Sequence, residues 1–436
     1  MYICTYFIHF GNYIIKMAYI KKLTKALVYV SAAMTLFSCS QKTEVNEEIG
    51  AVKTGKYHNL FTEVCGIPEE EVQQRIDSLW KHFFTPGDFA NFDGPEETSV
   101  YYEKGDDLGY IFDVGSNDVR TEGMSYGMMI ALQLNHQDVF DRLWNWSKNY
   151  MQFKEGAWEG YFAWNGTAEG TKLGNSNASD GEIYYATCLY LAANRWNDPH
   201  YKTEADELLQ KIQHKDKTSG VYPIFDEETK LPCFVPNEDV HWFSDPSYCL
   251  PAFIDLWVER SAADNEFWAA AADSTRNLLF NSCHHVSGLY PDYCLMDGTP
   301  FSWSNSAYDT SRFMYDAIRC AMNVGMDAHW WGKDIERQRG MIRRQLTHFR
   351  NNGYTNGHYN HDGTNPTDGF DAGTFGANAV GCFALLGSDN PADIELMKET
   401  VQIFWDQPIP SGHWRYYNGM VYMLSMLHVA GQFKAY

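Results

Sequence analysis

The chain has 436 residues, of which 44% are hydrophobic and 16% aromatic, and its formal net charge is -22. An acidic chain is unsuited to bind nucleic acid or an anionic membrane surface, because both attract basic proteins. The same charge disfavours polyanionic substrates such as pectin, whereas a neutral polymer fits. The aromatic surplus has two interpretations: most rings pack in a core, and a few could line a carbohydrate cleft, where flat rings cover the apolar faces of sugars.

The first predicted element is a targeting segment. Four lysines between residues 16 and 25 precede an apolar run, residues 26–38, that ends at Cys39. A basic region followed by a short apolar region is typical of a secretory signal. Leu-Phe-Ser before Cys39 resembles a bacterial lipobox, in which the cysteine carries the lipid and becomes the first mature residue. An uncleaved membrane anchor is the alternative, although the run is short for a spanning helix of about 20 residues.

These features predict a leader over residues 1–39, with Met17 as an alternative start, and a polar, flexible tether over residues 40–56. We therefore expect an exported protein of a Gram-negative bacterium, periplasmic or anchored to the outer membrane. The lipid on Cys39 would be its one contact with a membrane. No linker or charge block follows, so residues 57–436 are expected to form one catalytic domain, and we expect a monomer.

Helical periodicity dominates the remaining chain, between loops rich in Gly, Asn, Asp and Pro. Some segments, such as residues 184–193, are apolar on more than one face, which indicates inner helices buried on both sides. Twelve helices, alternately more and less buried, favour a double ring of six pairs. The expected helices are residues 69–84, 123–134, 137–152, 181–196, 202–214, 246–260, 263–280, 310–327, 331–350, 373–386, 392–406 and 415–432.

The first segment with chemical potential is Arg-Thr-Glu-Gly-Met-Ser-Tyr-Gly-Met-Met-Ile, residues 120–130, which places Glu122 where a long loop enters a helix. Met and Tyr side chains around this carboxyl would desolvate it, and desolvation raises a carboxyl pKa. A raised pKa keeps a general acid protonated near neutral pH. The pattern alone equally allows a first-turn glutamate that complements the helix dipole.

The second segment, Asn-Ser-Asn-Ala-Ser-Asp-Gly-Glu-Ile-Tyr at residues 175–184, puts Asp180 directly before a strongly apolar helix. Taken alone, this position is typical of an N-cap. The third segment carries Asp316 and Arg319 one turn apart on a mostly apolar expected helix. An Asp–Arg pair at this spacing is often exposed. Here the neighbours are apolar, which favours a buried carboxylate that Arg319 keeps ionised.

In this order, the three segments resemble those of glycoside hydrolase family 8. Glu-Gly-x-Ser-Tyr-Gly-Met-Met resembles its general-acid segment, Ser-Asp-Gly-Glu its central aspartate segment, and Tyr-Asp-Ala-x-Arg its general-base segment. Residues 414–433 resemble its closing helix, so the resemblance covers about residues 60–434. Residues 244–253 and 322–331 make the likeness greatest to the reducing-end xylose-releasing exo-oligoxylanases and related xylanases of that family.

The resemblance implies an all-α fold, the (α/α)6 barrel, and an inverting mechanism without metal or cofactor. It implies that Glu122 is the general acid, Asp316 the general base, and Asp180 the residue that stabilises the distorted sugar. The expected partner is a xylooligosaccharide or another neutral β-glycan, cut at a β-1,4-xylosidic bond with release of xylose from the reducing end. The substrate contacts that it implies are Trp164, as a stacking ring, and Tyr126, Tyr315, Arg319, Tyr416 and Tyr417.

Several other features are interpreted as structural. Asp245, before a proline at a helix start, is expected to be a cap. The eight cysteines after the leader form no CxxC pair, which argues against zinc. We expect buried free thiols, with Cys283–Cys294 the only close-spaced candidate for a disulfide. His284, His285 and His329 lack further ligands at metal-binding spacing.

Several alternatives stay open at this point. The enzyme could be an endo-acting xylanase, an endo-glucanase or a chitosanase on the same scaffold. It could instead be a non-catalytic glycan-binding lipoprotein. Exo action depends on a His-bearing loop that closes the cleft, and residues 351–372 hold His358 and His361, but this segment's length departs from the expected pattern.

Overall fold

The computed structural model describes residues 50–436, which belong to one compact unit. The predicted leader, Cys39 and most of the tether lie outside the described residues. The tether prediction is wrong at its C-terminal end. There, α2 (Ala51–Thr54) is a helical turn with a buried Ala51 that packs on α11 (Arg319–Trp331). The folded part therefore includes residues that their polar composition had assigned to a tether.

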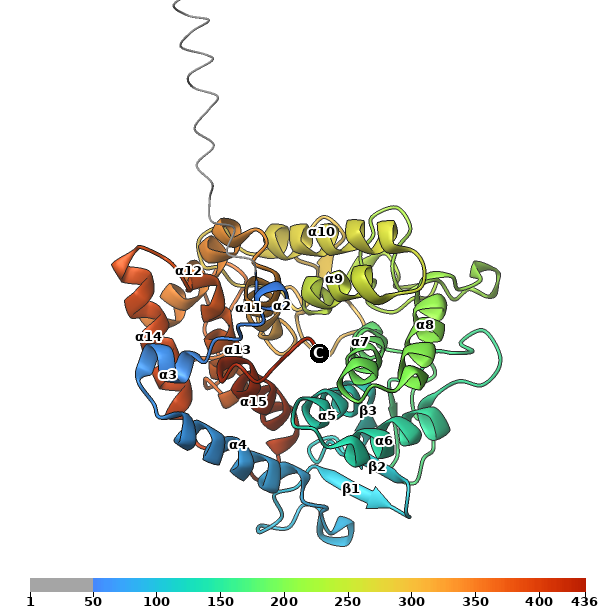
Figure 1. Cartoon of the computed structure of the whole chain (residues 1–436). Helices are drawn as coiled ribbons and strands as arrows, with labels where there is room; N and C mark the ends of the chain where they lie inside the picture. Colours follow the sequence, from blue (N-terminus) through green and yellow to red (C-terminus); the bar gives the residue numbers. More distant parts are fainter. Residues whose placement is uncertain (1–49) are drawn as a thin grey trace, which may run out of the picture. The chain divides into compact units, whose positions relative to one another are not determined.

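Twelve of the helices form two concentric rings (Figure 1). Each inner helix packs on the next, and the last packs on the first, which closes the ring. Each outer helix packs on at least one inner helix, so the predicted (α/α)6 barrel is confirmed. The inner helices are α5 (Thr121–Gln133), α7 (Ser179–Arg195), α9 (Pro251–Arg260), α11, α13 (Ala372–Gly381) and α15 (Arg415–Val429). The outer helices are α4 (Glu69–Phe84), α6 (Gln137–Trp146), α8 (Pro199–Gln213), α10 (Asn265–Ser282), α12 (Ile335–Asn351) and α14 (Pro391–Trp405).

Burial explains the division into rings. In the inner helix α7 every residue from 179 to 192 is buried, as its all-round apolar sequence requires. The outer helix α4 instead buries one stripe, Val72, Ile76, Leu79 and Phe83, and leaves its acidic first turn in solvent. Within residues 50–436, every helix is too short or too polar to span a bilayer.

The predicted helices differ from the observed ones mainly at their ends. The segment 137–152 leaves α-helical geometry after Trp146 and ends in a π-helical turn, Ser147–Met151. The segment 246–260 begins as a 3-10 turn, Pro246–Tyr248, and α9 starts only at Pro251. The helix α3 (Leu60–Cys65) was not predicted, because six residues are too few for periodicity to show. Further 3-10 turns are Phe89–Asn91, Lys217–Ser219 and Cys382–Leu385.

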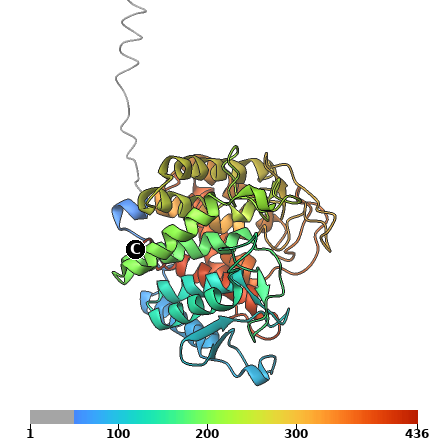
Figure 2. The ribbon, with the colours of Figure 1, turned by 90° about the vertical axis from the view of Figure 1, so that its right-hand side faces the viewer.

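Three short antiparallel strand pairs order the long loops, which gather at one end of the helices (Figure 2). The strand β3, which leads into α5, pairs with β4 in the loop before α7, and β5, in the loop before α9, pairs with β6 in the loop before α11. These two strand pairs therefore hold together the loops that lead into the inner helices α5, α7, α9 and α11. The strands are β1 (Tyr101–Lys104), β2 (Leu108–Ile111), β3 (Val119–Arg120), β4 (Asn165–Gly166), β5 (Phe243–Ser244) and β6 (Cys294–Leu295).

The eight cysteines of the described region are all free thiols, and seven of them are buried. The prediction of buried thiols is confirmed for these seven, while Cys65 is partly exposed. No bridge joins Cys283 to Cys294. The large apolar core therefore holds this part of the chain together without a cross-link.

Candidate active site

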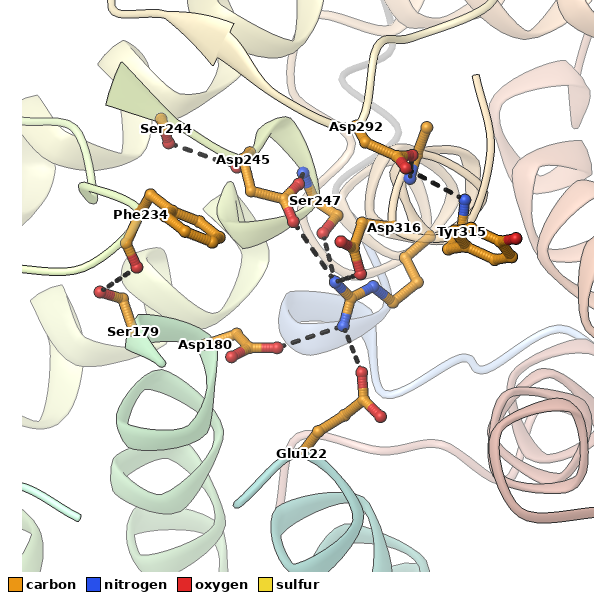
Figure 3. A network of polar contacts seen from close by, with 12 residues as sticks. Glu122, Ser179, Asp180, Phe234, Ser244, Asp245, Ser247, Asp292, Tyr315 and Asp316 are labelled. Atoms are coloured by element: carbon orange, nitrogen blue, oxygen red, sulfur yellow. Dashed lines mark hydrogen bonds and ion pairs between the residues drawn. The ribbon is translucent and has the colours of Figure 1, made fainter. Parts of the chain in front are cut away.

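Figure 3 shows five side chains, from four loops or helix starts, that point toward one another: Glu122, Asp180, Asp245, Ser247 and Asp316. All five contact Arg319, the centre of the site. It is the first residue of α11 and is 3% exposed. Its Nη1 atom lies 3.1 Å from Glu122 Oε2 and 3.1 Å from Asp180 Oδ2, and it donates to the Tyr126 hydroxyl at 2.8 Å. Its Nη2 atom lies 2.7 Å from Asp316 Oδ1. The structure thus brings the three predicted catalytic carboxyls onto one guanidinium.

The local fold accounts for the position of Glu122. The strand β3 leads directly into α5, and the Thr121 amide donates to the Trp164 carbonyl at 3.0 Å, beside β4. Glu122 is therefore the second residue of α5, with its side chain 18% exposed. Close approach is possible because residue 123 is glycine: a Cβ there would lie 2.5 Å from the Tyr416 ring. Tyr416 consequently donates its hydroxyl to Glu122 Oε1 at 2.9 Å.

The surroundings of Glu122 suit a proton donor. Burial raises its pKa, Arg319 opposes that rise, and the carboxylates of Asp180 and Asp316 add to it, so the pKa is raised to about 7. A carboxyl with this pKa is protonated in a large share of molecules at neutral pH. Desolvation therefore outweighs the direct contact with a cation, as the sequence had led us to expect.

Asp316 lies in a bend before α11, not inside a helix as the sequence predicted. The helix starts three residues later because the Asp292 carboxyl, and not the preceding helical turn, accepts the backbone N–H groups of Met314, Tyr315 and Ala317. The predicted pairing with Arg319 is confirmed despite this difference. A side chain on a bend can point into the site, whereas the same residue in mid-helix would follow the helical spacing.

Asp180 is the second residue of α7 and is 5% exposed. Its expected role as a cap is wrong: Ala178 is the N-cap, and no side chain caps this helix. The Asp180 carboxyl turns instead to Arg319. Its pKa is raised to about 6, because burial raises it more than Arg319 lowers it. Asp180 therefore belongs to the site by contact and not only by its place in the sequence.

Asp245 is a site residue that sequence reasoning passed over. It is the predicted cap, since its carboxyl accepts the Ser247 amide at 2.7 Å, and it also lies 3.5 Å from Arg319 Nη2. It is fully buried, and burial and the Asp316 charge raise its pKa well above the usual value. Ser247 adds a hydroxyl 2.7 Å from the same nitrogen. A cap signature in the sequence hides this second contact, because capping already explains the aspartate.

The predicted substrate contacts separate into exposed and buried rings. Trp164 is 37% exposed, with the Arg120 guanidinium 5.7 Å from its ring centre, and Tyr315 is 46% exposed. Tyr417 is partly exposed and donates to the Tyr315 carbonyl at 2.8 Å. Tyr126 and Tyr416 are buried. Tyr416 presents its hydroxyl to the site, where it donates to Glu122, and the roles of Tyr416 and Tyr126 as substrate contacts stay predictions.

The two histidines of segment 351–372 have different surroundings. The His358 ring lies edge-on to the Tyr315 ring, 4.8 Å away, and its Nδ1 is 2.8 Å from Asp368 Oδ2. His361 pairs through Nε2 with the Ser282 carbonyl at 2.8 Å. Only His358 is therefore next to a residue that flanks Asp316. Within residues 50–436, no three side chains of His, Cys, Asp or Glu are grouped to hold a metal ion.

The arrangement can perform acid–base chemistry on a glycosidic bond. A largely protonated Glu122 and the arginine-paired Asp316 face each other across one guanidinium. Their nearest oxygens are no farther apart than these two contacts plus the width of the guanidinium group. An inverting enzyme holds its two carboxyls roughly 6.5–9.5 Å apart to leave room for a water. The exposed rings of Trp164 and Tyr315 could cover sugar faces beside this pair.

Comparison with known proteins agrees with this chemistry. A sequence model described as Glycosyl hydrolases family 8 matches residues 106–430. The chain is 37% identical over 398 residues to the reducing end xylose-releasing exo-oligoxylanase of Halalkalibacterium halodurans, covering 88% of this chain and 96% of that protein. It is 35% identical over 399 residues to the reducing-end xylose-releasing exo-oligoxylanase Rex8A of Paenibacillus barcinonensis, covering 89% and 98%.

A solved structure of Rex8A complexed with xylose matches with a TM-score of 0.79 at 36% identity, covering 89% of this chain and 99% of that one. A more distant relative, Endoglucanase C of Ruminiclostridium cellulolyticum, is 26% identical over 324 residues and is matched over 64% of its length.

Proposed function

The chain belongs to family 8 of the glycosyl hydrolases, and from this membership we propose that it hydrolyses β-1,4-xylosidic bonds in xylooligosaccharides and releases xylose from the reducing end. The observation that carries the chemistry is the convergence of Glu122, Asp180 and Asp316 on Arg319. The substrate is supported by the relatives named reducing-end xylose-releasing exo-oligoxylanase, which this chain matches over nearly their whole length.

The proposed reaction is a single displacement. Glu122 protonates the oxygen of the leaving xylose, while Asp316 takes a proton from a water that attacks the anomeric carbon from the opposite face. Asp180 binds and stabilises the distorted sugar at the cleaved bond. Arg319 contacts all three carboxyls and so fixes their positions relative to one another. The configuration at the anomeric carbon inverts, and the chain needs no covalent intermediate.

A time course on xylotetraose tests both bond choice and stereochemistry. Release from the reducing end gives xylotriose and xylose as the only initial products, whereas endo action gives xylobiose early. Proton NMR of the first turnovers should show the new reducing end of xylotriose as the α anomer. A β anomer would rule out inversion. Parallel digests of cellotetraose and chitosan tetramer separate the other activities, and cleavage of these alone would overturn the xylan assignment.

We further propose that the protein is exported as a monomeric lipoprotein. The support is the basic and apolar run before Cys39, which lies outside the described residues. Radiolabelled palmitate should be incorporated by the full chain and not by Cys39→Ala, and light scattering should give the mass of one chain. Palmitate on the Cys39→Ala protein would contradict the lipidation site.

A further inference from the structure

Asp292 is a buried carboxylate that holds the segment carrying Asp316. Its Oδ1 atom accepts the Ala317 amide at 2.9 Å and the Met314 amide at 3.3 Å, and its Oδ2 accepts the Tyr315 amide at 3.3 Å (Figure 3). Asp292 is fully buried. Three backbone groups on both sides of Asp316 are therefore tied to one side chain.

The backbone around Asp292 strengthens this tie. The Asp292 amide donates to the Arg312 carbonyl at 2.8 Å, and the Tyr293 amide donates to the Thr310 carbonyl at 2.8 Å. Residues 310–312 lead directly into the bend that holds Asp316. The backbone of Asp292 and Tyr293 thus holds residues 310–312, which lead into the bend. The Asp292 carboxyl holds the bend itself.

The charge of Asp292 is costly where it lies. A buried carboxylate needs strong partners, and among residues 50–436 the only hydrogen-bond donors to it are these three amides. Burial raises its pKa, the Asp316 charge raises it further, and the three amides lower it. The Asp316 carboxylate pairs instead with Arg319, where Oδ1 is 2.7 Å from Nη2.

We propose that Asp292 is a positioning residue for the general base: it holds the backbone of residues 314–317 so that the Asp316 carboxylate faces Arg319 and the attacking water. The inference rests on the proposed role of Asp316. It goes further by assigning a task to a fully buried residue whose carboxyl bonds the backbone around Asp316 and not Arg319. A purely structural role, in which Asp292 only stabilises the loop, is the rival explanation.

The test is Asp292→Asn, which keeps one oxygen for the Ala317 and Met314 amides and puts an NH2 group against the Tyr315 amide. With xylotriose as substrate, we expect kcat to fall about 10²-fold, as displacing a catalytic group by an ångström does. KM should change less than about threefold, because binding does not use the base. Asp226→Asn is the matched control. Asp226 also accepts two backbone amides of one turn, those of Glu228 and Thr229, in a different loop, and its loss should leave kcat unchanged.

A double-mutant cycle separates positioning from stability. If Asp292 acts through Asp316, Asp292→Asn should cost less than about threefold in kcat when Asp316 is already Asn. An equal cost in both backgrounds, or a fall in kcat that matches the loss of folded protein, overturns the proposal. Should Asp292→Asn fail to fold, Asp292→Ser, which leaves a smaller acceptor and room for water, is carried through the same cycle.

The controls also keep the two proposals apart. Inactive wild type on xylooligosaccharides, or an Asp316→Asn variant as active as wild type, contradicts the proposed function. An active wild type and an impaired Asp316→Asn, combined with an additive cycle, contradict only the role of Asp292.

Discussion

Nη1 of Arg319 lies 3.1 Å from Oε2 of Glu122, so the proposed general acid is in contact with a cation that favours loss of its proton. The same guanidinium pairs with Asp316, the proposed general base. One arginine therefore contacts both proposed catalytic groups. Burial resolves the conflict, because it raises the pKa of Glu122 more than Arg319 lowers it.

Replacing Arg319 should therefore disable the site more than a simple loss of charge would. Lysine is a point charge and cannot bridge carboxylates on two sides as a guanidinium does. We expect Arg319→Lys to lower kcat on xylotriose by about 10²-fold or more, as misplacing catalytic groups does. Arg276→Lys is the control, since Arg276 is equally buried and pairs with Asp255 and Asp327. It should lower the melting temperature without a selective loss of kcat. Activity of Arg319→Lys within threefold of wild type would contradict the bridging role.

Glu122→Gln should reveal the acid through its dependence on the leaving group. Without a proton donor, we expect hydrolysis of xylotriose to slow by about 10²–10⁴-fold. Fluoride leaves without needing a proton, so the hydrolysis of β-xylobiosyl fluoride should slow far less. Asp316→Asn should impair both substrates, because the attacking water still needs a base. The measurement is kcat/KM for each substrate, and an equal loss on both in Glu122→Gln would mean that Glu122 is not the acid.

The alkaline side of the pH profile should report Glu122. The acid works only while protonated, and its pKa is raised to about 7, so kcat/KM should be retained below this pH and lost as the pH rises through it. Asp180 carries a negative charge that adds to this rise. Asp180→Asn should therefore move the alkaline limb of the kcat/KM profile to lower pH, whatever its effect on the maximal value of kcat/KM. Profiles of kcat/KM on xylotriose from pH 5 to 9 give the answer, and a shift to higher pH would contradict the assignment.

Trp164 should contribute to binding and not to the chemical step. Its ring is exposed, and it directly precedes β4, which pairs with the strand β3 that leads to Glu122. We expect Trp164→Ala to raise KM for xylotetraose about tenfold with little change in kcat, since a stacked ring is worth about 1 kcal/mol or more beyond a plain apolar contact. Phe280→Ala removes a similarly exposed ring from the outer helix α10 and should leave KM unchanged. A fall in kcat alone would place Trp164 in the chemistry instead.

The barrel could be predicted because inner and outer helices differ in how much of their surface is apolar. Burial on all sides of α7 is visible in its sequence, as is the single apolar stripe of α4. The helix start at Arg319 could not be predicted. The segment before it is as apolar as a helix, and only a long-range contact, from Asp292, replaces its helical hydrogen bonds.

The site was predicted unevenly for a related reason. Glu122, Asp180 and Asp316 stand in motifs that can be matched to a family, yet their shared partner is a matter of three-dimensional packing. Asp245 shows most clearly what the local sequence cannot predict, because its predicted role as a cap is correct and already explains why an aspartate is there. Its approach to Arg319 depends on a contact between residues 74 positions apart, which no local pattern encodes.

The contact of α15 with α5 has a consequence for biosynthesis. Tyr416, near the start of α15, reaches Glu122 only because the final helix closes the ring. A nascent chain stopped before residue 415 would already carry Glu122, Asp180 and Asp316, yet it would have an open barrel and an acid without its tyrosine. Synthesis from the N-terminus therefore supplies Glu122, Asp180 and Asp316 before α15, so we expect activity to begin only once α15 has been made.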